Sequence, residues 1–257
     1  MSAFTKGLAI VSGGASGLGE AVARRIVAQG GRVCIADMNK ARAQMISDEL
    51  GSHAVWAQAD CTSEDQVNEA LDLAEKTFGE PVTAAVSTAG TLHAAKTVSR
   101  KGVPHGLDPF ERVLRVNVLG TFNVSRLAAQ RMAGRAPDAE TGERGVIINT
   151  ASIAAMDGQA GQVAYSASKG AIVGMTLPMA RDLSPLGIRV CTICPGIFET
   201  PMMAQAPDSL RESLFSAIPF PPRFGKPDEF ASFVQTIVDN PYLNGEVIRI
   251  DGAVRMV

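Results

Sequence analysis

The chain has 257 residues, of which 46% are apolar and 19% are charged, as expected for a globular protein with a substantial core. Its formal net charge of −2 argues against a nucleic-acid-binding or anionic-membrane surface spread over the whole protein, so we expect no nucleic-acid partner. No stretch approaches the ~18 consecutive apolar residues of a membrane span, and the six residues before Gly7 are too few for a cleavable presequence.

Short apolar runs typical of strands alternate with longer helical patterns along the whole chain. The predicted strands are Leu8–Ser12, Val33–Asp37, Val55–Ala59, Thr83–Val86, Val146–Thr150, Ile188–Cys194 and Val247–Ile250. The predicted helices span about residues 17–29, 40–50, 63–78, 108–132 and 165–183, the last despite Pro178, which should kink it. Strands separated by single helices imply right-handed crossovers. We therefore predict one α/β domain over residues 1–257, with a doubly wound, seven-stranded parallel sheet and helices on both faces.

The four cysteines are too few for a disulfide framework, which favours a reducing, intracellular environment. Cys191 and Cys194 have the spacing of a redox or zinc motif, but they lie in the predicted strand Ile188–Cys194. Residues three apart on a strand point to opposite faces of the sheet, so we expect two separate core thiols. The histidines occur in no metal-ligand pattern, and we expect no metal.

Two segments interrupt the alternation of strands and helices. Lys96–Gly106 is basic and loop-like, and Pro201–Phe224 is rich in proline, methionine and phenylalanine. Long loops in compact domains are often functional, although variable surface insertions explain them equally well. We predict a substrate loop at about residues 201–224, with core packing as the alternative role of its apolar side chains, which are Met202, Met203, Leu210, Leu214, Phe215 and Phe220.

A glycine-rich turn joins the first predicted strand to the first predicted helix. Gly13, Gly17 and Gly19 form the pattern Gly-x-x-x-Gly-x-Gly, which permits a tight turn and lets the backbone approach a pyrophosphate at the helix N-terminus. Such a turn often has no ligand, but its position between a strand and a helix favours a nucleotide site. The turn therefore indicates a Rossmann fold.

Acidic residues follow the next two predicted strands. Asp37 ends the second strand, where a carboxylate accepts hydrogen bonds from the adenosine ribose and repels a 2′-phosphate. Neither Leu18 nor Met38 supplies the arginine that an NADP site needs nearby, so we expect NAD as the cofactor. Capping of a turn is the alternative role for Asp37. Asp60, after the third strand, is expected to reach the adenine edge.

Tyr165 and Lys169 are four residues apart, which places both side chains on one face of a helix. A phenol has a pKa near ~10, and a neighbouring ammonium favours the phenolate, so we predict that Lys169 lowers the pKa of Tyr165. Taken alone, this pair is more often a surface pair than a catalytic one.

Taken together, the motifs from Gly13 to Gly252 resemble the short-chain dehydrogenase/reductase family over nearly the whole chain. Further matching motifs are Pro195-Gly196, Thr200 and Asp251-Gly252. The catalytic set that this resemblance implies is Asn117, Ser152, Tyr165 and Lys169. The implied cofactor-binding residues are Gly13, Ser16, Gly17, Leu18, Gly19, Asp37, Asp60, Cys61, Thr88, Gly90, Tyr165, Lys169, Pro195, Gly196, Phe198 and Thr200. The implied substrate contacts are Ser152, Gln159 and Tyr165.

Within the family, the chain is most similar to the type 2 3-hydroxyacyl-CoA dehydrogenases, also called 17β-hydroxysteroid dehydrogenases type 10. The segments that carry this similarity are residues 96–106, 146–152, 172–178, 219–221 and 243–249. One departure is Ser87, which stands where the family's Asn-x-Ala-Gly turn has its asparagine; a turn hydrogen bond is then lost unless the serine replaces it.

The resemblance implies NAD-dependent oxidation of a 3-hydroxyacyl-CoA to a 3-ketoacyl-CoA, with hydroxysteroids as further substrates. Tyr165 as phenolate removes the hydroxyl proton, Lys169 tunes it and holds the nicotinamide ribose, and Ser152 stabilises charge on the substrate oxygen. Asn117 is expected to position a water between Lys169 and solvent. The resemblance also implies a homotetramer that pairs the helices at 108–132 and 165–183, and a mitochondrial location in a eukaryote or a cytoplasmic one otherwise.

Two alternatives remain at this stage. An NADPH-dependent 3-ketoacyl or carbonyl reductase uses the same four catalytic residues. A non-catalytic nucleotide-binding scaffold keeps the fold, although such proteins usually lose the tyrosine or the lysine, which are both present here. The basic residues Lys96, Arg100 and Lys101 are candidates for contact with the phosphates of CoA, or are simply solvated surface.

Overall fold

The structure is a computed structural model that describes residues 7–256. The expectation about a presequence concerns the six residues before Gly7 and lies outside this range, as do the two ends of the predicted domain, residues 1–257. Within residues 7–256, no helix is both long enough and apolar enough to cross a membrane.

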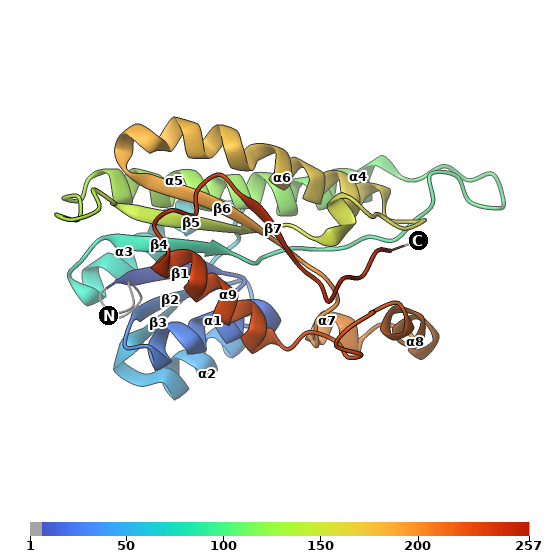
Figure 1. Ribbon diagram of the computed structural model, residues 1–257, viewed down its shortest axis with the longest axis horizontal. Helices are drawn as coiled ribbons and strands as arrows, with labels where there is room; N and C mark the ends of the chain where they lie inside the picture. The colour runs from blue at the N-terminus through green and yellow to red at the C-terminus, as the bar shows by residue number, and fades with distance from the viewer. Residues whose placement is uncertain (1–6, 257) are drawn as a thin grey trace.

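One parallel sheet of seven strands runs through the molecule in the order β3-β2-β1-β4-β5-β6-β7 (Figure 1). The strands are β1 Leu8–Ser12, β2 Arg32–Asp37, β3 Ala54–Gln58, β4 Val82–Ser87, β5 Gly145–Thr150, β6 Ile188–Pro195 and β7 Val247–Ile250. Their ends differ from the predicted strands by at most one residue. The chain leaves β1 towards β2 on one side and returns to β4 on the other, which is the topological switch point of a doubly wound sheet. The predicted fold class is confirmed.

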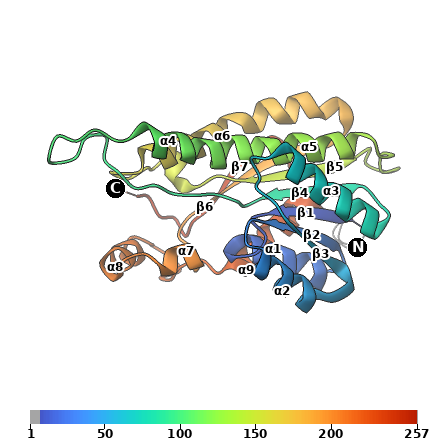
Figure 2. The ribbon, with the colours of Figure 1, turned by 180° about the vertical axis from the view of Figure 1, so that it is seen from behind.

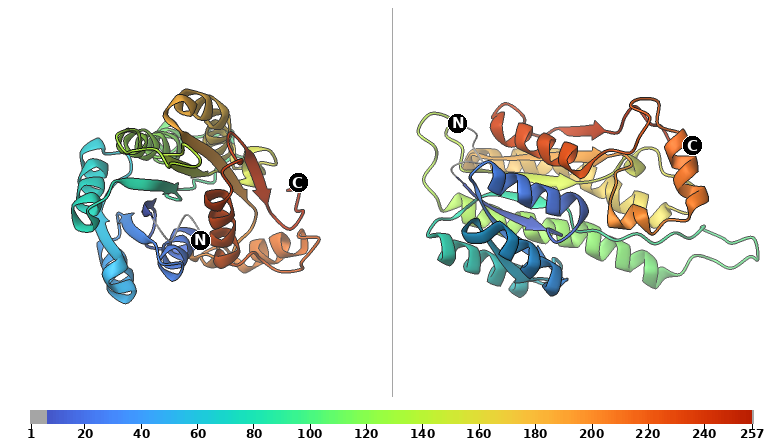
Figure 3. Two further views of the ribbon diagram at one scale, coloured as in Figure 1. Left: turned by 60° about the vertical axis from the view of Figure 1, so that its left-hand side comes forward. Right: turned by 90° about the horizontal axis from the view of Figure 1, so that it is seen from below.

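Helices cover both faces of the sheet, as Figures 1 and 2 show. One face carries α1 Gly17–Ala28, α2 Lys40–Leu50 and α9 Pro227–Asp239. The other carries α3 Glu64–Phe78, α4 Leu107–Leu114, α5 Thr121–Ala133 and α6 Val163–Leu183. Two short helices, α7 Pro201–Ala204 and α8 Asp208–Ser216, lie beyond the carboxyl ends of the strands (Figure 3).

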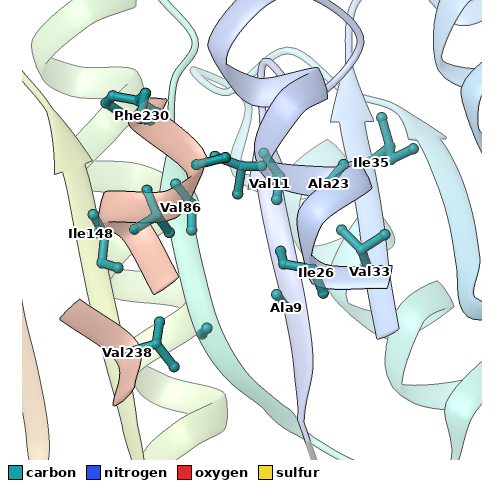
Figure 4. Packing of buried hydrophobic residues seen from close by; sticks show 14 of the residues in the cluster. Ala9, Val11, Ala23, Ile26, Val33, Ile35, Val86, Ile148, Phe230 and Val238 are labelled. Carbon is teal, nitrogen blue, oxygen red and sulfur yellow. The ribbon is translucent and has the colours of Figure 1, made fainter. Parts of the chain in front are cut away.

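The largest cluster of buried side chains lies between the sheet and the helices α1 and α9 (Figure 4). Ile26 of α1 and Phe230 of α9 are fully buried and pack towards strand residues such as Val11 and Ile148. The two cysteines of β6 illustrate the alternation of the strand, because Cys191 belongs to this cluster whereas Cys194 packs with Ile172 on the α6 side. They are buried free thiols on opposite faces, as predicted.

Three predictions about helices need correction. The predicted helix at 108–132 is divided, because a π-helical segment, Arg115–Gly120, separates α4 from α5. The predicted loop at 201–224 contains α7 and α8. The predicted elements also miss α9, whose apolar residues follow a helical period that begins after the proline at its first position. The helix α6 runs through Pro178, which is exposed.

Candidate active site

A cavity of about 780 Å³ opens at the carboxyl ends of the strands, next to the switch point between β1 and β4. It is lined by side chains from α1, α6 and α7 as well as by the strand ends. Every predicted cofactor-binding and substrate residue lines it, and so do Ser152, Tyr165 and Lys169. Asn117 does not line the cavity but lies next to Gly90, which does. The structure thus brings residues from all parts of the chain to one site, while their individual roles stay predictions.

The glycine turn after β1 leaves no room for side chains. Gly13 has φ +73°, and a Cβ there would lie 2.6 Å from the Ala89 nitrogen, whereas a Cβ at Gly19 would collide with the Gly13 carbonyl oxygen. Ser16 precedes α1 in an extended conformation, and its side chain caps none of the helix N–H groups. The N–H groups of the first turn of α1 therefore have no side-chain acceptor, and this cradle fits the pyrophosphate of a dinucleotide.

Asp37 ends β2 with its carboxylate held between two backbone donors. The Ala15 N–H donates to Oδ2 at 3.0 Å, and the Asn39 N–H donates to Oδ1 at 2.8 Å. The carboxylate therefore ties the glycine turn to the start of α2 and keeps free lone pairs for further donors.

The glycine turn also contacts a cation that the sequence reasoning missed. Arg42, in the first turn of α2, donates to the Ala15 carbonyl oxygen at 3.4 Å and to Oε2 of Glu20 at 2.7 Å. Glu20 also pairs with Arg24 at 2.8 Å. Arg42 is therefore engaged by a carboxylate that it shares with Arg24, and it is not among the cavity-lining residues.

On the adenine side, Asp60 and Cys61 follow β3. The Asp60 carboxylate accepts a hydrogen bond from the Thr62 N–H at 2.8 Å, and its own N–H donates to Gln66 at 2.8 Å. Burial raises the pKa of the Cys61 thiol to about 11, so this cavity-lining side chain is uncharged at neutral pH. Asp60 is thereby fixed at the cavity edge.

Tyr165 and Ser152 lie side by side, joined by a hydrogen bond, at the other end of the cavity. The Ser152 Oγ accepts a hydrogen bond from the Ala154 N–H at 3.1 Å, which orients the hydroxyl. Burial raises the pKa of Tyr165, and a hydrogen bond from Ser152 opposes this by lowering it. This differs from the prediction that Lys169 lowers the pKa of Tyr165, because the dominant influence in the structure is the loss of water around the phenol.

Lys169 is buried and donates from Nζ to the Thr150 carbonyl oxygen at 2.7 Å. Nζ lies 5.7 Å from the centroid of the Tyr165 ring, so the ammonium and the phenol are neighbours. Burial lowers the pKa of Lys169 to about 8. A cation with such a pKa, fixed beside a phenol and at the edge of a nucleotide cavity, is suited to holding a neighbouring hydroxyl and to biasing proton transfer.

Asn117 owes its position to the π-helical segment, whose extra residue per turn directs this side chain inwards. The Thr91 N–H donates to its Oδ1 at 2.8 Å, and Nδ2 donates to the Thr91 carbonyl and the Ser168 hydroxyl, both at 2.9 Å. Ser168 donates in turn to the Tyr165 carbonyl at 2.7 Å. Asn117 therefore links the segment after β4 to the helix that carries Tyr165; its proposed contact with a water stays a prediction.

The departure at Ser87 has a clear structural outcome. The Ser87 Oγ is buried and makes no hydrogen bond with the described residues, so it does not replace the asparagine. Thr88 takes over the link between β4 and the glycine turn, because its Oγ1 donates to the Ser12 carbonyl oxygen at 2.8 Å.

The segment after β6 closes the cofactor side of the cavity. Gly196 passes so close to Asp251 that a Cβ would lie 2.8 Å from its Cα. Phe198 is buried and packs edge-to-face against Phe230 at 6.3 Å. The Thr200 hydroxyl caps α7 by accepting a hydrogen bond from the Met203 N–H at 3.3 Å, and its methyl group faces Gly17.

Several cavity-lining residues were not predicted from the sequence. They are mostly apolar or basic and come from α4, the π-helical segment, the C-terminal segment and the segments that follow β4 and β5: Leu92, Arg112, Arg115, Val116, Ile153, Gln162 and Met256. Arg112 and Arg115 form a helical i, i+3 pair, which is the only signal for them, and no local signal marks Met256.

Comparison with known proteins assigns the family. A family model described as short chain dehydrogenase matches residues 7–211. The chain belongs to the short chain dehydrogenase family. It is therefore an oxidoreductase with a Rossmann site for NAD(H) or NADP(H), and not the scaffold considered as an alternative.

Individual relatives cover almost the entire chain. The human 3-hydroxyacyl-CoA dehydrogenase type-2 is 54% identical over 253 residues, which is 98% of this chain and 96% of that protein. The crystal structure of 3-hydroxyacyl-CoA dehydrogenase type-2 from Mycobacterium avium matches with a TM-score of 0.94 and 43% identity, over 98% of each chain. The structure of 3-ketoacyl-(acyl-carrier-protein) reductase from Brucella melitensis complexed with NADH has a TM-score of 0.84 and 29% identity, over 98% of this chain and 99% of that one. Similarity to the dehydrogenases is thus higher than to the reductase.

Proposed function

We propose that this short chain dehydrogenase oxidises a 3-hydroxyacyl-CoA to a 3-ketoacyl-CoA with NAD⁺. The observation that carries the proposal is the placement of Ser152, Tyr165 and Lys169 at the junction between a dinucleotide cradle and an apolar extension of the same cavity. The high identity to 3-hydroxyacyl-CoA dehydrogenases type-2 supports the acyl-CoA substrate. Hydroxysteroids, which are also apolar secondary alcohols, are proposed as further substrates.

In this mechanism Ser152 donates a hydrogen bond to the substrate oxygen, while Tyr165 accepts the hydroxyl proton. Bound NAD⁺ supplies the hydride acceptor. Burial of Tyr165 favours its protonated form, and the Ser152 hydrogen bond and the charge of Lys169 favour the phenolate. Oxidation is therefore expected to be faster at higher pH, where Tyr165 has lost its proton. Reduction is expected to be faster at lower pH, where Tyr165 carries it. Lys169 also holds the nicotinamide ribose through the ammonium that faces the cavity.

NAD is proposed over NADP because of the charges around Asp37. Its carboxylate has lone pairs left for the ribose hydroxyls, and it would repel a 2′-phosphate. Arg42, which contacts the glycine turn at Ala15, is engaged by Glu20. The related reductase structure contains NADH, which shows that a member of this fold with lower identity holds the same class of dinucleotide.

The acyl chain is proposed to enter the part of the cavity beneath α7 and α8. The wall there is made of flexible apolar side chains, namely Met202, Met203, Leu210, Leu214 and Met256. Such a wall accepts chains of different length and shape. The expectation of a substrate loop at 201–224 is therefore kept as a proposal, with two helices as its framework.

The basic segment Lys96–Gly106 is proposed to meet the CoA phosphates. It is a tight turn closed by the Ser99 N–H donating to the Val103 carbonyl at 2.8 Å, and it projects beyond α4 (Figure 1). Its base is tied to the cavity rim, since the Ala95 N–H donates to the Gly161 carbonyl at 2.9 Å. Lys96, Arg100 and Lys101 are exposed and do not line the cavity, so they would touch only the outer part of a long ligand.

Reversing these three charges to glutamate is expected to raise KM for acyl-CoA roughly tenfold, because exposed ion pairs are worth up to ~1 kcal/mol each. KM for a steroid alcohol is expected to stay unchanged. Lys76→Glu, an exposed change on α3 remote from the cavity, is the control. An unchanged KM for acyl-CoA in the triple variant would remove the phosphate contact from the proposal.

The substrate proposal is tested by following NAD⁺ reduction at the nicotinamide absorbance with acyl-CoAs of several chain lengths, steroids and simple alcohols. We expect a 3-hydroxyacyl-CoA to have the highest kcat/KM among these substrates. Preference for NADPH and a ketoacyl substrate would instead support the reductase alternative.

We further propose a homotetramer and an intracellular location, mitochondrial in a eukaryote. The helices expected to pair carry exposed apolar side chains, including Leu119, Phe122 and Leu177, each at least 44% exposed. Four buried free thiols agree with a reducing compartment.

A further inference from the structure

An ion-pair network lies next to the active site without forming part of the catalytic set. Arg249 of β7 donates to Oδ2 of Asp157 and to Oδ2 of Asp251, both at 2.6 Å. The side chains of these three residues are largely buried, with exposures of 20%, 16% and 9%. Arg249 also donates to the Val254 carbonyl at 2.9 Å. One guanidinium on β7 thus joins two further segments of chain, one at Asp157 and one at residues 251–254.

The first segment is the turn that carries Ser152. The backbone N–H groups of Ala155 and Asp157 donate to the carbonyls of Ser152 and Ile153, at 3.0 and 2.9 Å, which makes residues 152–157 a compact unit. The Arg249 hydrogen bond holds the pKa of Asp157 below its ordinary value, so this carboxylate is charged at neutral pH. The end of the unit is therefore anchored to β7 by a charge-assisted contact, and Ser152 is at its beginning.

The second segment is the C-terminal chain after β7. Asp251 accepts a hydrogen bond from the Ala253 N–H at 3.0 Å, and Gly252 and Ala253 have positive φ angles of 60° and 65°. This tight turn directs Val254 into a buried cluster with Ile153, the residue next to Ser152. Met256, two residues further, lines the cavity beside α8.

We propose that Asp157 and Arg249 are positioning residues. They hold the Ser152 hydroxyl in a fixed position relative to the Met256 side chain, which lines the cavity. The pair touches neither the cavity nor the proposed substrate. It fixes one catalytic group and one wall of the apolar pocket to the same strand, so that the substrate oxygen and the acyl chain are aligned together. This proposal rests on the proposed function, because it takes Ser152 as the residue that donates a hydrogen bond to the substrate oxygen.

The test uses Asp157→Asn and Arg249→Met, which break the pair, and Arg249→Lys, which retains the charge. Asp157→Asn is expected to lower kcat roughly tenfold, because small displacements of a catalytic group have effects of this size or larger. KM is expected to rise more for a long-chain than for a short-chain 3-hydroxyacyl-CoA, and the Kd for NADH by fluorescence titration is expected to change less than twofold. Arg249→Lys is expected to recover part of the activity that Arg249→Met loses.

The matched control is Glu143→Gln. Glu143 forms a comparable partly buried pair with Arg189 of β6 at 2.9 Å, at the amino end of the strands and away from the cavity. This variant is expected to lose thermal stability while keeping wild-type kcat and KM. If Asp157→Asn behaved in the same way, with lower stability and unchanged kinetics, the pair would be purely structural and the proposal overturned.

Amide hydrogen exchange separates this proposal from the substrate assignment. Faster exchange in both 153–157 and 251–256 of Asp157→Asn, with the rest of the chain unchanged, is expected and requires no substrate. Unchanged exchange in 251–256 would overturn the coupling. If the wild-type protein oxidised no 3-hydroxyacyl-CoA, the proposed function would fail, and the exchange data would still decide whether Arg249 couples the two segments.

Discussion

Tyr165→Phe is expected to lower kcat for alcohol oxidation by roughly 10²- to 10⁴-fold, the range that positioned proton transfer contributes. The variant removes one oxygen from a half-buried ring and keeps the ring that packs beside Lys169. Binding of NADH, which does not need the phenol proton, is expected to stay close to wild type. Stopped-flow or steady-state absorbance of NADH formation measures the loss.

Tyr242→Phe is the matched control, because Tyr242 is the other tyrosine of the chain and is 97% exposed. It is expected to leave kcat unchanged. The wild-type rate of oxidation is expected to rise with pH as Tyr165 loses its proton, and this dependence should disappear from the residual activity of Tyr165→Phe. A Tyr165→Phe variant with wild-type turnover would contradict the catalytic role of Tyr165. It would favour a function that does not use proton transfer by this tyrosine.

The sheet could be predicted from sequence because its strands are short, apolar and separated by helices. The positions of the glycine turn and Asp37 at the cavity were equally predictable, since they depend on backbone geometry at the end of a strand. Features that depend on packing between distant segments could not be predicted in this way. The π-helical segment that directs Asn117 inwards has no distinctive amino-acid composition. The hydrogen-bond partners of Asn117 there, Thr91 and Ser168, are distant in the sequence.

The electrostatics of the site show the same limit. A spacing of four residues correctly places Tyr165 and Lys169 on one helix face, but it contains no information about burial. The structure adds the Thr150 carbonyl, which holds the Lys169 ammonium, and the desolvation that raises the pKa of Tyr165. Burial therefore outweighs the lowering influences on the Tyr165 pKa, and the spacing of the pair could not reveal this balance.

Long-range ion pairs are the least accessible from sequence. Asp157 and Arg249 are 92 residues apart, and nothing in either local sequence indicates a partner. The same holds for Glu20 and Arg42, which are 22 residues apart. Both pairs join segments that are distant in the sequence, and only the assembled fold identifies them.

Asp37→Ala is expected to raise KM for NAD⁺ by roughly 10- to 100-fold, because hydrogen bonds to a charged group contribute ~1.5–3 kcal/mol each. The change removes the acceptor for the ribose hydroxyls and also the tie between Ala15 and Asn39. It removes the negative charge that repels a 2′-phosphate, so KM for NADP⁺ is expected to fall at the same time. Initial rates with both cofactors measure the ratio of kcat/KM.

The arrangement of Arg42 makes this prediction sharper. In Asp37→Ala alone, Arg42 is still paired with Glu20. The double variant Asp37→Ala/Glu20→Gln weakens that pair and is expected to gain a further severalfold in NADP⁺ preference, because a guanidinium then becomes available to a phosphate. Asp48→Ala, which removes an exposed carboxylate from α2, is the control and should leave both KM values unchanged. Tighter binding of NADPH than of NADH by the wild-type protein would contradict the role given to Asp37, whereas an unchanged ratio in the double variant would contradict only the role given to Arg42.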